Sequence, residues 1–106
     1  MSERSHQYYL KNKNMPAFVY NRYKVGARRR HLIFHISYQD FLFFLWNKPC
    51  HYCNDKLIKI GIDRVDSSKG YHIGNVVPCC GTCNYMKSSL PREVFLNQCK
   101  KIASHF

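Results

Sequence analysis

Two pairs of cysteines and two oxygen-bearing side chains make up the part of this sequence that could do chemistry. Each pair has the spacing Cys-x-x-Cys, and the four cysteines are Cys50, Cys53, Cys80 and Cys83. Asp63 lies between the pairs, and Asn84 directly follows the second pair. Carboxylate and amide oxygens suit a hard divalent cation such as Mg²⁺ or Mn²⁺. A fold that joins the two cysteine pairs would also bring Asp63 close to Asn84.

The four cysteines predict a structural zinc site, which we call the zinc knot. Two thiolates separated by two residues can reach one zinc ion from a tight turn, and two such turns supply four sulfur ligands. Four ligands leave no open coordination position, so this zinc would stabilise the fold and take no part in catalysis. Cys79 is an alternative ligand to its neighbour Cys80, although the spacing favours Cys80. Cys99 lies on the apolar face of a predicted helix, where it would simply pack.

Composition indicates a small intracellular protein that binds a polyanion. The 106 residues include 17 lysines and arginines against 6 acidic residues, and the net charge of +11 favours nucleic acid as the partner. No secretory signal is visible, so we expect a cytoplasmic, reducing location in which cysteines bind zinc rather than form disulfides. The longest apolar run, 41–46, is too short to span a bilayer, so no membrane partner is expected.

Upstream of the cysteines, the sequence predicts a polar arm followed by helices. Residues 1–15 are expected to be a frayed or loosely docked N-terminal arm. Residues 16–48 are basic and apolar, and they divide into two helices joined by a short extended segment, 32–36. Pro16 is suited to the first turn of the first helix. Ser37 is a good N-cap for the second helix.

From the first cysteine pair onward, the sequence predicts a hairpin and two more helices. Partial alternation of apolar and polar residues indicates a hairpin over 57–79, whose first strand is 57–62 and whose loop is long. A short helix should follow and end at Lys87. The last helix, within 91–106, has one apolar face made of Phe95, Cys99, Ile102 and Phe106. The whole chain is therefore predicted to be one small α+β domain.

The region around the cysteine pairs, about residues 50–90, resembles the HNH nucleases, also called His-Me finger or ββα-metal nucleases. The resemblance is carried by Gly61-Ile-Asp-Arg-Val-Asp66 and by the run from Asn75 through Cys83-Asn84 to Lys87. The cysteine pairs stand where the zinc-bound version of the family has them. The resemblance implies a ββα-metal core with a four-cysteine zinc knot and flanking helices. Among characterised members, the Asp-Arg version is that of a restriction enzyme.

The resemblance also implies roles for single residues. Asp63 matches the carboxylate that binds a divalent cation, and Asn84 matches the second cation ligand, on the helix. Asn75 matches the residue that braces the loop through hydrogen bonds to backbone. Arg64 departs from the family pattern, in which a water-activating histidine usually follows the aspartate. A guanidinium keeps its proton at ordinary pH, so Arg64 would bind phosphate and stabilise charge rather than accept a proton.

The proton acceptor, or a different nucleophile, must then lie elsewhere. Tyr52 is one candidate, because a nearby arginine would lower the pKa of its phenol. His72, in the hairpin loop, is another candidate, because an imidazole has a suitable pKa. Further options are His31, His35 and His51. Loss of catalysis in the arginine version is the remaining alternative.

These features predict a metal-dependent endonuclease that hydrolyses DNA, with a phage or mobile-element origin by analogy. One chain offers one site, so a monomer would nick DNA and a homodimer would cut both strands. Backbone phosphates would be contacted by a set of basic side chains, Arg22, Lys24, Arg28, Arg29, Arg30 and Lys87. The alternatives are a non-catalytic zinc-stabilised module that binds DNA or RNA, a nuclease for RNA or branched DNA, and a redox protein.

Overall fold

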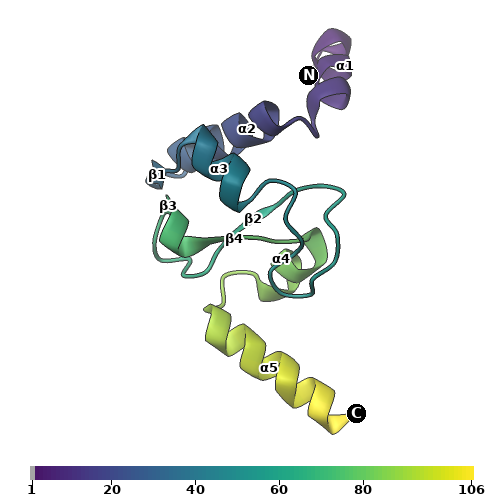
Figure 1. Cartoon of the computed structure of the whole chain (residues 1–106), viewed down its shortest axis with the longest axis vertical. Coiled ribbons are helices and arrows are strands. Elements are labelled where there is room, and N and C mark those ends of the chain that lie inside the picture. The colour runs from purple at the N-terminus through teal and green to yellow at the C-terminus, as the bar shows by residue number, and fades with distance from the viewer. Residues whose placement is uncertain (1) are drawn as a thin grey trace.

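The computed structural model describes residues 2–106. The helices are α1 (Glu3–Asn12), α2 (Pro16–Arg29), α3 (Tyr38–Phe44), α4 (Gly81–Lys87) and α5 (Arg92–His105), with a 3-10 turn η1 (Ile73–Asn75). The strands are β1 (Phe34–His35), β2 (Ile62–Arg64), β3 (Tyr71–His72) and β4 (Val76–Pro78). The molecule is elongated, about 50 × 27 × 27 Å, with α1 and α5 at opposite ends (Figure 1). Within 2–106, no helix is both long enough and apolar enough to cross a membrane.

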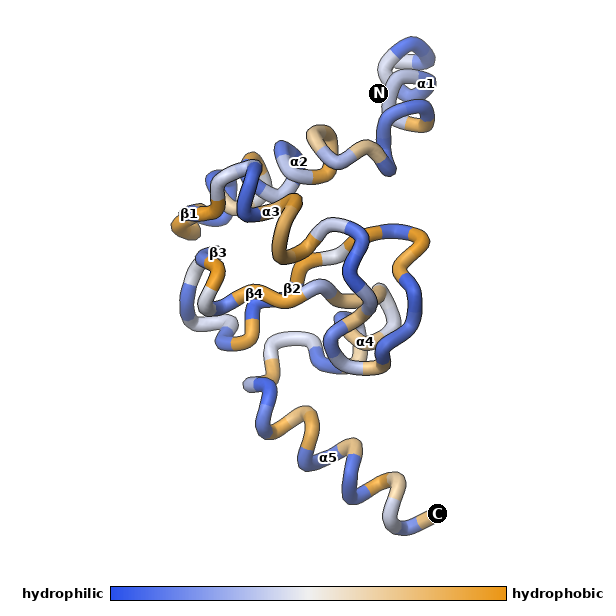
Figure 2. Tube along the Cα trace, in the orientation of Figure 1, coloured by the Kyte–Doolittle hydropathy of each residue, from blue (hydrophilic) through white to orange (hydrophobic). Residues whose placement is uncertain are grey.

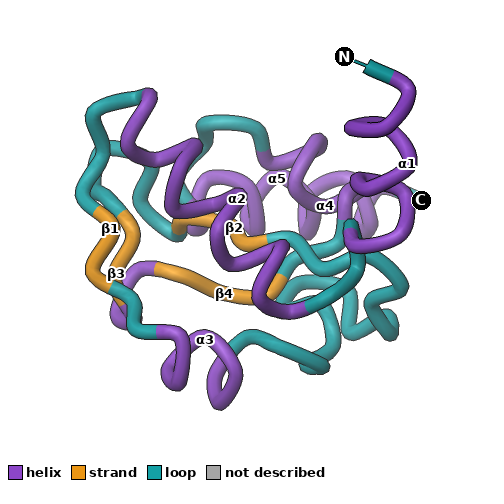
Figure 3. Tube along the Cα trace, turned by 90° about the horizontal axis from the view of Figure 1, so that it is seen from above, coloured by secondary structure: helices purple, strands orange, loops and turns teal. Residues whose placement is uncertain are grey.

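Two short two-stranded sheets lie between the helices (Figure 3). β2 pairs antiparallel with β4, and Asp63 is the middle residue of β2. β1 pairs in parallel with β3, with Phe34 opposite Tyr71. This second pairing requires Gly70, because a Cβ there would lie 2.7 Å from the carbonyl oxygen of Ile33. The β2–β4 hairpin followed by α4 confirms the predicted ββα arrangement.

A hydrophobic core joins α2 and α3 to both sheets. Its buried members are Val19, Ala27, Ile36, Phe41, Leu45, Ile60, Ile62, Tyr71 and Val76. Figure 2 shows an apolar stretch at β4, whereas α1 is mostly hydrophilic. Burial of each large apolar side chain contributes roughly 1.5–3 kcal/mol, so this core is what fixes α2 against the hairpin.

The helix starts follow local rules that the sequence displays. Pro16 opens α2, and the hydroxyl of Ser37 caps α3 by accepting from the Asp40 backbone N–H at 3.1 Å. Cys80 caps α4 in the same way, because its sulfur accepts from the Cys83 N–H at 3.3 Å. A cysteine of the zinc knot therefore also positions the helix that follows it.

The N-terminal arm is more regular than expected. Residues Glu3–Asn12 form a helix whose N-cap is Ser2, although none of its residues is buried. The arm touches α2 through the rings of Tyr8 and Tyr9, whose centres lie 6.1 and 6.0 Å from that of Phe18. We expected a frayed or loosely docked arm, and the helix itself was not predicted, because its sequence is mostly polar.

Two other predictions need correction. The first hairpin strand begins at Ile62 instead of residue 57, and Ile58 is 93% exposed, because 57–61 has no strand beside it to pair with. In α5, only Phe95 is buried, whereas Ile102 and Phe106 are 52% and 98% exposed. The helix points away from the rest of the molecule (Figure 1), and along its predicted apolar face only Phe95 and Cys99, near its start, are buried or partly buried.

Candidate functional site

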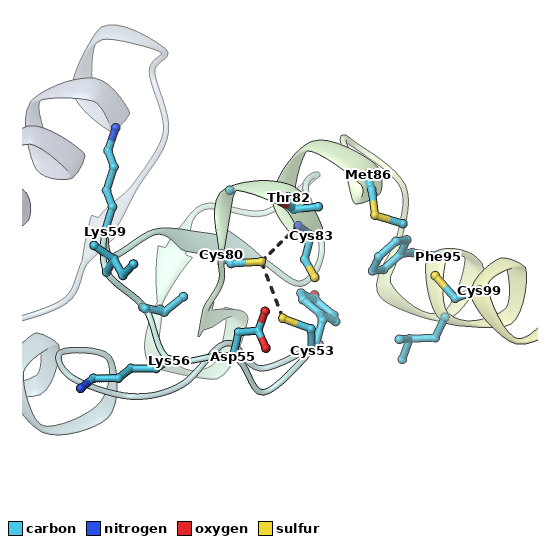
Figure 4. Close-up of a pocket in the computed structure, with 15 residues that line it drawn as sticks. Cys53, Asp55, Lys56, Lys59, Cys80, Thr82, Cys83, Met86, Phe95 and Cys99 are labelled. Atoms are coloured by element: carbon cyan, nitrogen blue, oxygen red, sulfur yellow. Dashed lines mark hydrogen bonds between the residues drawn. The ribbon is translucent and has the colours of Figure 1, made fainter. Parts of the chain in front are cut away.

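The four predicted zinc ligands lie together beside the hairpin. The sulfur atoms of Cys50, Cys53, Cys80 and Cys83 all lie within 4.8 Å of one another. The sulfurs of Cys53 and Cys80 are 3.8 Å apart, which matches the edge of about 3.8 Å in a tetrahedron with Zn–S bonds of about 2.3 Å. Figure 4 shows the side chains of Cys53, Cys80 and Cys83 converging. These cysteines can therefore hold a zinc ion.

The remaining two cysteines stand outside this cluster. Cys79 is buried, and its thiol donates to the carbonyl oxygen of Cys80 at 3.3 Å. Burial, followed by the neighbouring Cys50, raises the pKa of Cys79 to about 12, so it stays a neutral thiol. Cys99 is partly buried on α5. The spacing argument for Cys80 over Cys79 is confirmed.

Asp63 is buried, and both of its carboxylate oxygens accept hydrogen bonds. Oδ2 accepts from the hydroxyl of Tyr52 at 2.7 Å, and Oδ1 accepts from Nζ of Lys87 at 3.3 Å. Nζ of Lys87 also donates to the carbonyl oxygen of Arg64 at 3.1 Å. The exposed fractions of Asp63 and Lys87 are 4% and 0%. A buried ion pair therefore fixes the orientation of the predicted metal-binding carboxylate.

The prediction that Lys87 contacts phosphates is wrong for this structure, because the side chain is fully buried. The last turn of α4 faces β2, and an unpaired carboxylate at Asp63 would cost several kcal/mol. Lys87 supplies the compensating charge. One sequence signal could have indicated this, since Lys87 follows Asn84 by three residues and shares its helix face.

Asp63 and Asn84 line the same cavity, which has a volume of about 420 Å³. Arg64 lines it as well, so the structure brings together three residues that the sequence singled out. Other lining residues are Tyr23, Arg30, Ser67, Tyr71, Ser88 and Ser89. A carboxylate and an amide in one polar cavity fit a hard cation that prefers oxygen ligands.

Arg64 is oriented by the loop that follows β2. Its Nη1 donates to the carbonyl oxygens of Ser67 and Lys69, both at 2.8 Å. Its guanidinium carbon lies 5.5 Å from the centre of the Tyr71 ring. These contacts leave the Nε–Nη2 edge, which can bind a phosphate through two hydrogen bonds.

Asn75 braces the same loop, as the resemblance implied. Its side chain accepts from the Asp66 N–H at 2.9 Å, and its amide donates to the carbonyl oxygens of Asp66 and Gly70 at 3.0 and 2.9 Å. Asn75 is buried at 4% exposure. A buried amide with all three of these bonds holds the loop in one conformation, and this positions Arg64.

Comparisons with known proteins bear on the fold. No model of a known protein family matches the chain. The chain is similar to protein R423 of Acanthamoeba polyphaga mimivirus, with 38% identity over 89 residues. The aligned region covers 82% of this chain but only 17% of that relative. Its structure is similar to that of PacI, described as a rare-cutting HNH restriction endonuclease that perturbs DNA. The TM-score is 0.70 with 18% identity, over 86% of this chain and 78% of PacI. The chain has an HNH endonuclease-like fold.

Tyr52 lies at the Asp63 carboxylate, but its ionisation differs from expectation. We expected a nearby arginine to lower the pKa of its phenol. Burial instead raises that pKa, and the hydrogen bond to Asp63 raises it further. The ring also packs against Phe95, with centres 5.4 Å apart. Tyr52 in this structure is therefore a neutral phenol that donates to Asp63.

His72 lies away from the cavity. Successive strand residues face opposite sides, so His72 points to solvent while its neighbour Tyr71 faces the cavity. The other three candidate histidines are also exposed and line no part of this cavity, namely His31, His35 and His51. Tyr52 does not line this cavity either, since it belongs to the cavity beside Cys53 and Cys80. Of the candidates for proton transfer in residues 2–106, however, only Tyr52 touches Asp63.

Apart from Lys87, the basic residues predicted to contact phosphates lie on α2 and at its end. Arg22, Lys24, Arg28 and Arg29 are exposed, and their contact with phosphates stays a prediction. On the same helix, the hydroxyl of Tyr23 accepts from the Ile62 N–H at 3.1 Å, and burial raises the pKa of Tyr23. Tyr23 therefore links α2 to the start of β2. No periodicity marks such a contact, because it depends on how two distant segments meet.

Proposed function

We propose that this protein is a metal-dependent endonuclease that hydrolyses DNA phosphodiester bonds. The observation that carries the proposal is the shared cavity of Asp63, Arg64 and Asn84, beside four cysteines that can hold zinc. The likeness in fold to the restriction endonuclease PacI supports it, and so does the net charge of +11.

Asp63 and Asn84 are proposed to hold Mg²⁺ or Mn²⁺ through oxygen. A divalent cation bound there would stabilise negative charge on the phosphate and on the leaving oxygen. The contacts of Asp63 with Tyr52 and Lys87 hold the carboxylate in place before any ligand arrives. Such supporting hydrogen bonds orient a ligand and tune its affinity.

Arg64 is proposed to contact the phosphate directly. Its Nη1 is occupied by the loop carbonyls, so the Nε–Nη2 edge is available to the substrate. A guanidinium fixed before the reaction stabilises the charge that develops on phosphate oxygens. Asn75 contributes by holding the loop whose carbonyls fix Arg64.

Hydrolysis adds a water oxygen to phosphorus, breaks one P–O bond and requires a group that accepts the proton of the water. We assign this role to Tyr52 rather than His72, because the Tyr52 hydroxyl contacts Asp63 and His72 faces solvent. The charge of Asp63 is one cause of the raised pKa of Tyr52. Neutralisation of that charge would lower the pKa of the phenol. Tyr52 would then release its own proton to solvent, and the resulting phenolate would accept the proton of the attacking water.

Cleavage of supercoiled plasmid in Mg²⁺ tests the proposal, with Asn84→Ala as the decisive variant. Asp63→Ala is less informative, because it would leave the buried ammonium of Lys87 unpaired and destabilise the protein. Asn84 is exposed, so its truncation should retain the fold and slow cleavage by about 100-fold or more. Asn97→Ala, at an exposed asparagine of α5, is the matched control.

The form of the cleaved plasmid distinguishes a monomer from a homodimer. One cavity in each chain predicts relaxed circles from a monomer, whereas a homodimer would give linear DNA directly. A panel of duplex DNA, branched DNA and RNA identifies the substrate class. If Asn84→Ala cleaves as fast as Asn97→Ala, the proposed role of the cavity is wrong.

A non-catalytic module that binds DNA or RNA is the second candidate. It is favoured by one observation, because both oxygens of Asp63 already accept hydrogen bonds from Tyr52 and Lys87. A cation would have to share this carboxylate or displace the ammonium. Binding of nucleic acid without cleavage in Mg²⁺, Mn²⁺ and Co²⁺ would support the module.

A further inference from the structure

We propose that Arg30 and Arg64 form one paired phosphate-binding site, organised by the ring and hydroxyl of Tyr71. The inference rests on the proposed function, because it says where the cavity holds a phosphate of the substrate. The sequence predicted only general phosphate contact for Arg30, as part of a basic run, and gave Tyr71 no role.

One aromatic ring contacts both guanidinium groups. Nη2 of Arg30 donates to the hydroxyl of Tyr71 at 2.8 Å, and the Arg30 guanidinium carbon lies 5.8 Å from the ring centre. The guanidinium carbon of Arg64 lies 5.5 Å from the same centre. Both distances are within the range of a cation–π contact. Two arginines that are distant in sequence therefore share one anchor at the wall of the cavity.

The anchor itself is fixed. Tyr71 is 3% exposed, and its ring centre lies 5.5 Å from that of Phe34 and 6.2 Å from that of Tyr23. Its backbone N–H donates to the carbonyl oxygen of Ile33 at 2.8 Å. A long arginine side chain loses less entropy on binding when a rigid partner already holds it. Tyr71 thus prepares Arg30, which is otherwise exposed at the end of α2.

The charges at the cavity indicate that an anion belongs there. The carboxylate of Asp63, which lines the cavity, is already paired with Lys87. Within residues 2–106, neither Arg30 nor Arg64 forms an ion pair. Two guanidinium groups that line one cavity without a counter-ion favour an anion there, and a phosphate that both contact would accept several hydrogen bonds.

The hydrogen-bonding atoms that remain suit such a ligand. Nε of Arg30 donates to the carbonyl oxygen of Gly26 at 3.3 Å, and its Nη2 donates to the hydroxyl of Tyr71, so its Nη1 is available. Arg64 has its Nε–Nη2 edge available. Both face a cavity that Asp63 also lines, so the phosphate would be held next to the proposed cation site.

A double-mutant cycle on binding tests the pair. The probe is a fluorescein-labelled 20-base-pair duplex of random sequence, and its anisotropy gives Kd at several salt concentrations without added divalent cation. Arg30→Ala should weaken binding about tenfold and make the salt slope shallower by about one, as the loss of one phosphate contact does. Tyr71→Phe removes the hydroxyl that holds Arg30 and should weaken binding about threefold.

The coupling between the two changes decides the matter. In the Arg30→Ala background, Tyr71→Phe should have no further effect, whereas with Arg28→Ala the two effects should multiply. Equal effects of Tyr71→Phe in both backgrounds would overturn the inference, as would an unchanged salt slope in Arg30→Ala. If Tyr71→Phe fails to fold, Arg30→Lys replaces it. That variant keeps the charge but lacks the planar group that donates to Tyr71 and to a phosphate at the same time. It should therefore bind more weakly at an unchanged slope, and wild-type affinity would contradict the pair.

This readout is independent of cleavage. Coupling without cleavage of plasmid would retain the phosphate site and refute the nuclease. Cleavage without coupling would retain the nuclease and refute the paired site.

Discussion

The zinc knot and the Asp63 cavity are neighbouring sites with opposite designs. The knot offers four sulfur atoms within 4.8 Å of one another, enough to fill the coordination of one zinc ion. The cavity offers one carboxylate, one amide and two guanidinium groups around a volume of about 420 Å³. A site that satisfies its ion with protein ligands alone can only stabilise the fold, whereas a site with few protein ligands leaves room for substrate and water.

The two sites also differ in how their charges are arranged. The knot gathers groups of one kind, which a single cation could unite. The cavity separates its charges, because Lys87 neutralises Asp63 inside the fold, whereas Arg30 and Arg64 contact one ring and form no ion pair within residues 2–106. The basic residues of this chain therefore occupy two different environments, since Lys87 is buried against Asp63 whereas Arg30 and Arg64 line the cavity.

Loss of a knot ligand is expected to have the largest effect. Cys53→Ser should abolish the cooperative fold, because metal binding in such small domains is worth roughly 10–16 kcal/mol and supplies most of their stability. Circular dichroism and measured zinc content give the readout. Cys99→Ser, at a thiol outside the knot, is the control and should retain both. A Cys53→Ser protein that folds without zinc would show that the knot is not needed for stability.

The knot was readable from the sequence because its signal is local. Two Cys-x-x-Cys spacings suffice to name the ligands, and even Cys79 could be set aside by spacing. The pairing of β2 with β4 followed from hairpin and turn patterns in the same way, although the first strand started later than predicted. Local rules predicted α2, α3 and α4 well, since their caps lie within a few residues of each start.

The second prediction concerns the buried ion pair. Lys87→Met leaves the Asp63 carboxylate buried without its ammonium, so the free energy of unfolding should fall by about 3 kcal/mol or more. Mg²⁺ or Mn²⁺ should restore part of this loss, because a cation at Asp63 replaces the missing charge. Urea denaturation with and without the cation measures both effects.

Lys56→Met, at an exposed lysine, is the matched control for that measurement. It should change stability by no more than about 0.5 kcal/mol and show no difference in its response to the cation. Loss of stability in Lys87→Met without any rescue would mean that Asp63 does not bind a divalent cation.

The ion pair of Asp63 with Lys87 and the contacts of Arg30 and Arg64 with Tyr71 could not be predicted from the sequence. Lys87 looked like a surface lysine, because its burial depends on the packing of α4 on β2. Arg30 and Tyr71 are far apart in sequence, and their hydrogen bond exists only because the core fixes α2 against β3. Residue types and spacing named Asp63, Arg64, Asn75 and Asn84, but they could not name the partners that orient them.

The third prediction separates the two candidates for proton transfer. Tyr52→Phe should slow plasmid cleavage by about 100-fold, within the usual range for a lost acid–base group, while DNA affinity stays nearly the same. His72→Ala should change the cleavage rate by less than about twofold, because His72 faces solvent outside the cavity. Single-turnover rates and anisotropy give the two readouts. The reverse ranking would assign the role to His72 and refute our placement of Tyr52.

The smallest effect is expected at the far end of α5, which belongs to neither site. Ile102→Ser should alter the free energy of unfolding by about 0.5 kcal/mol or less, because the side chain is half exposed and only Phe95 of this helix is buried. Urea denaturation at two protein concentrations measures this. A larger loss that appears only at the higher concentration would show that two chains associate through this face. The comparison would then have to include a partner, and direct cutting of both DNA strands would be expected.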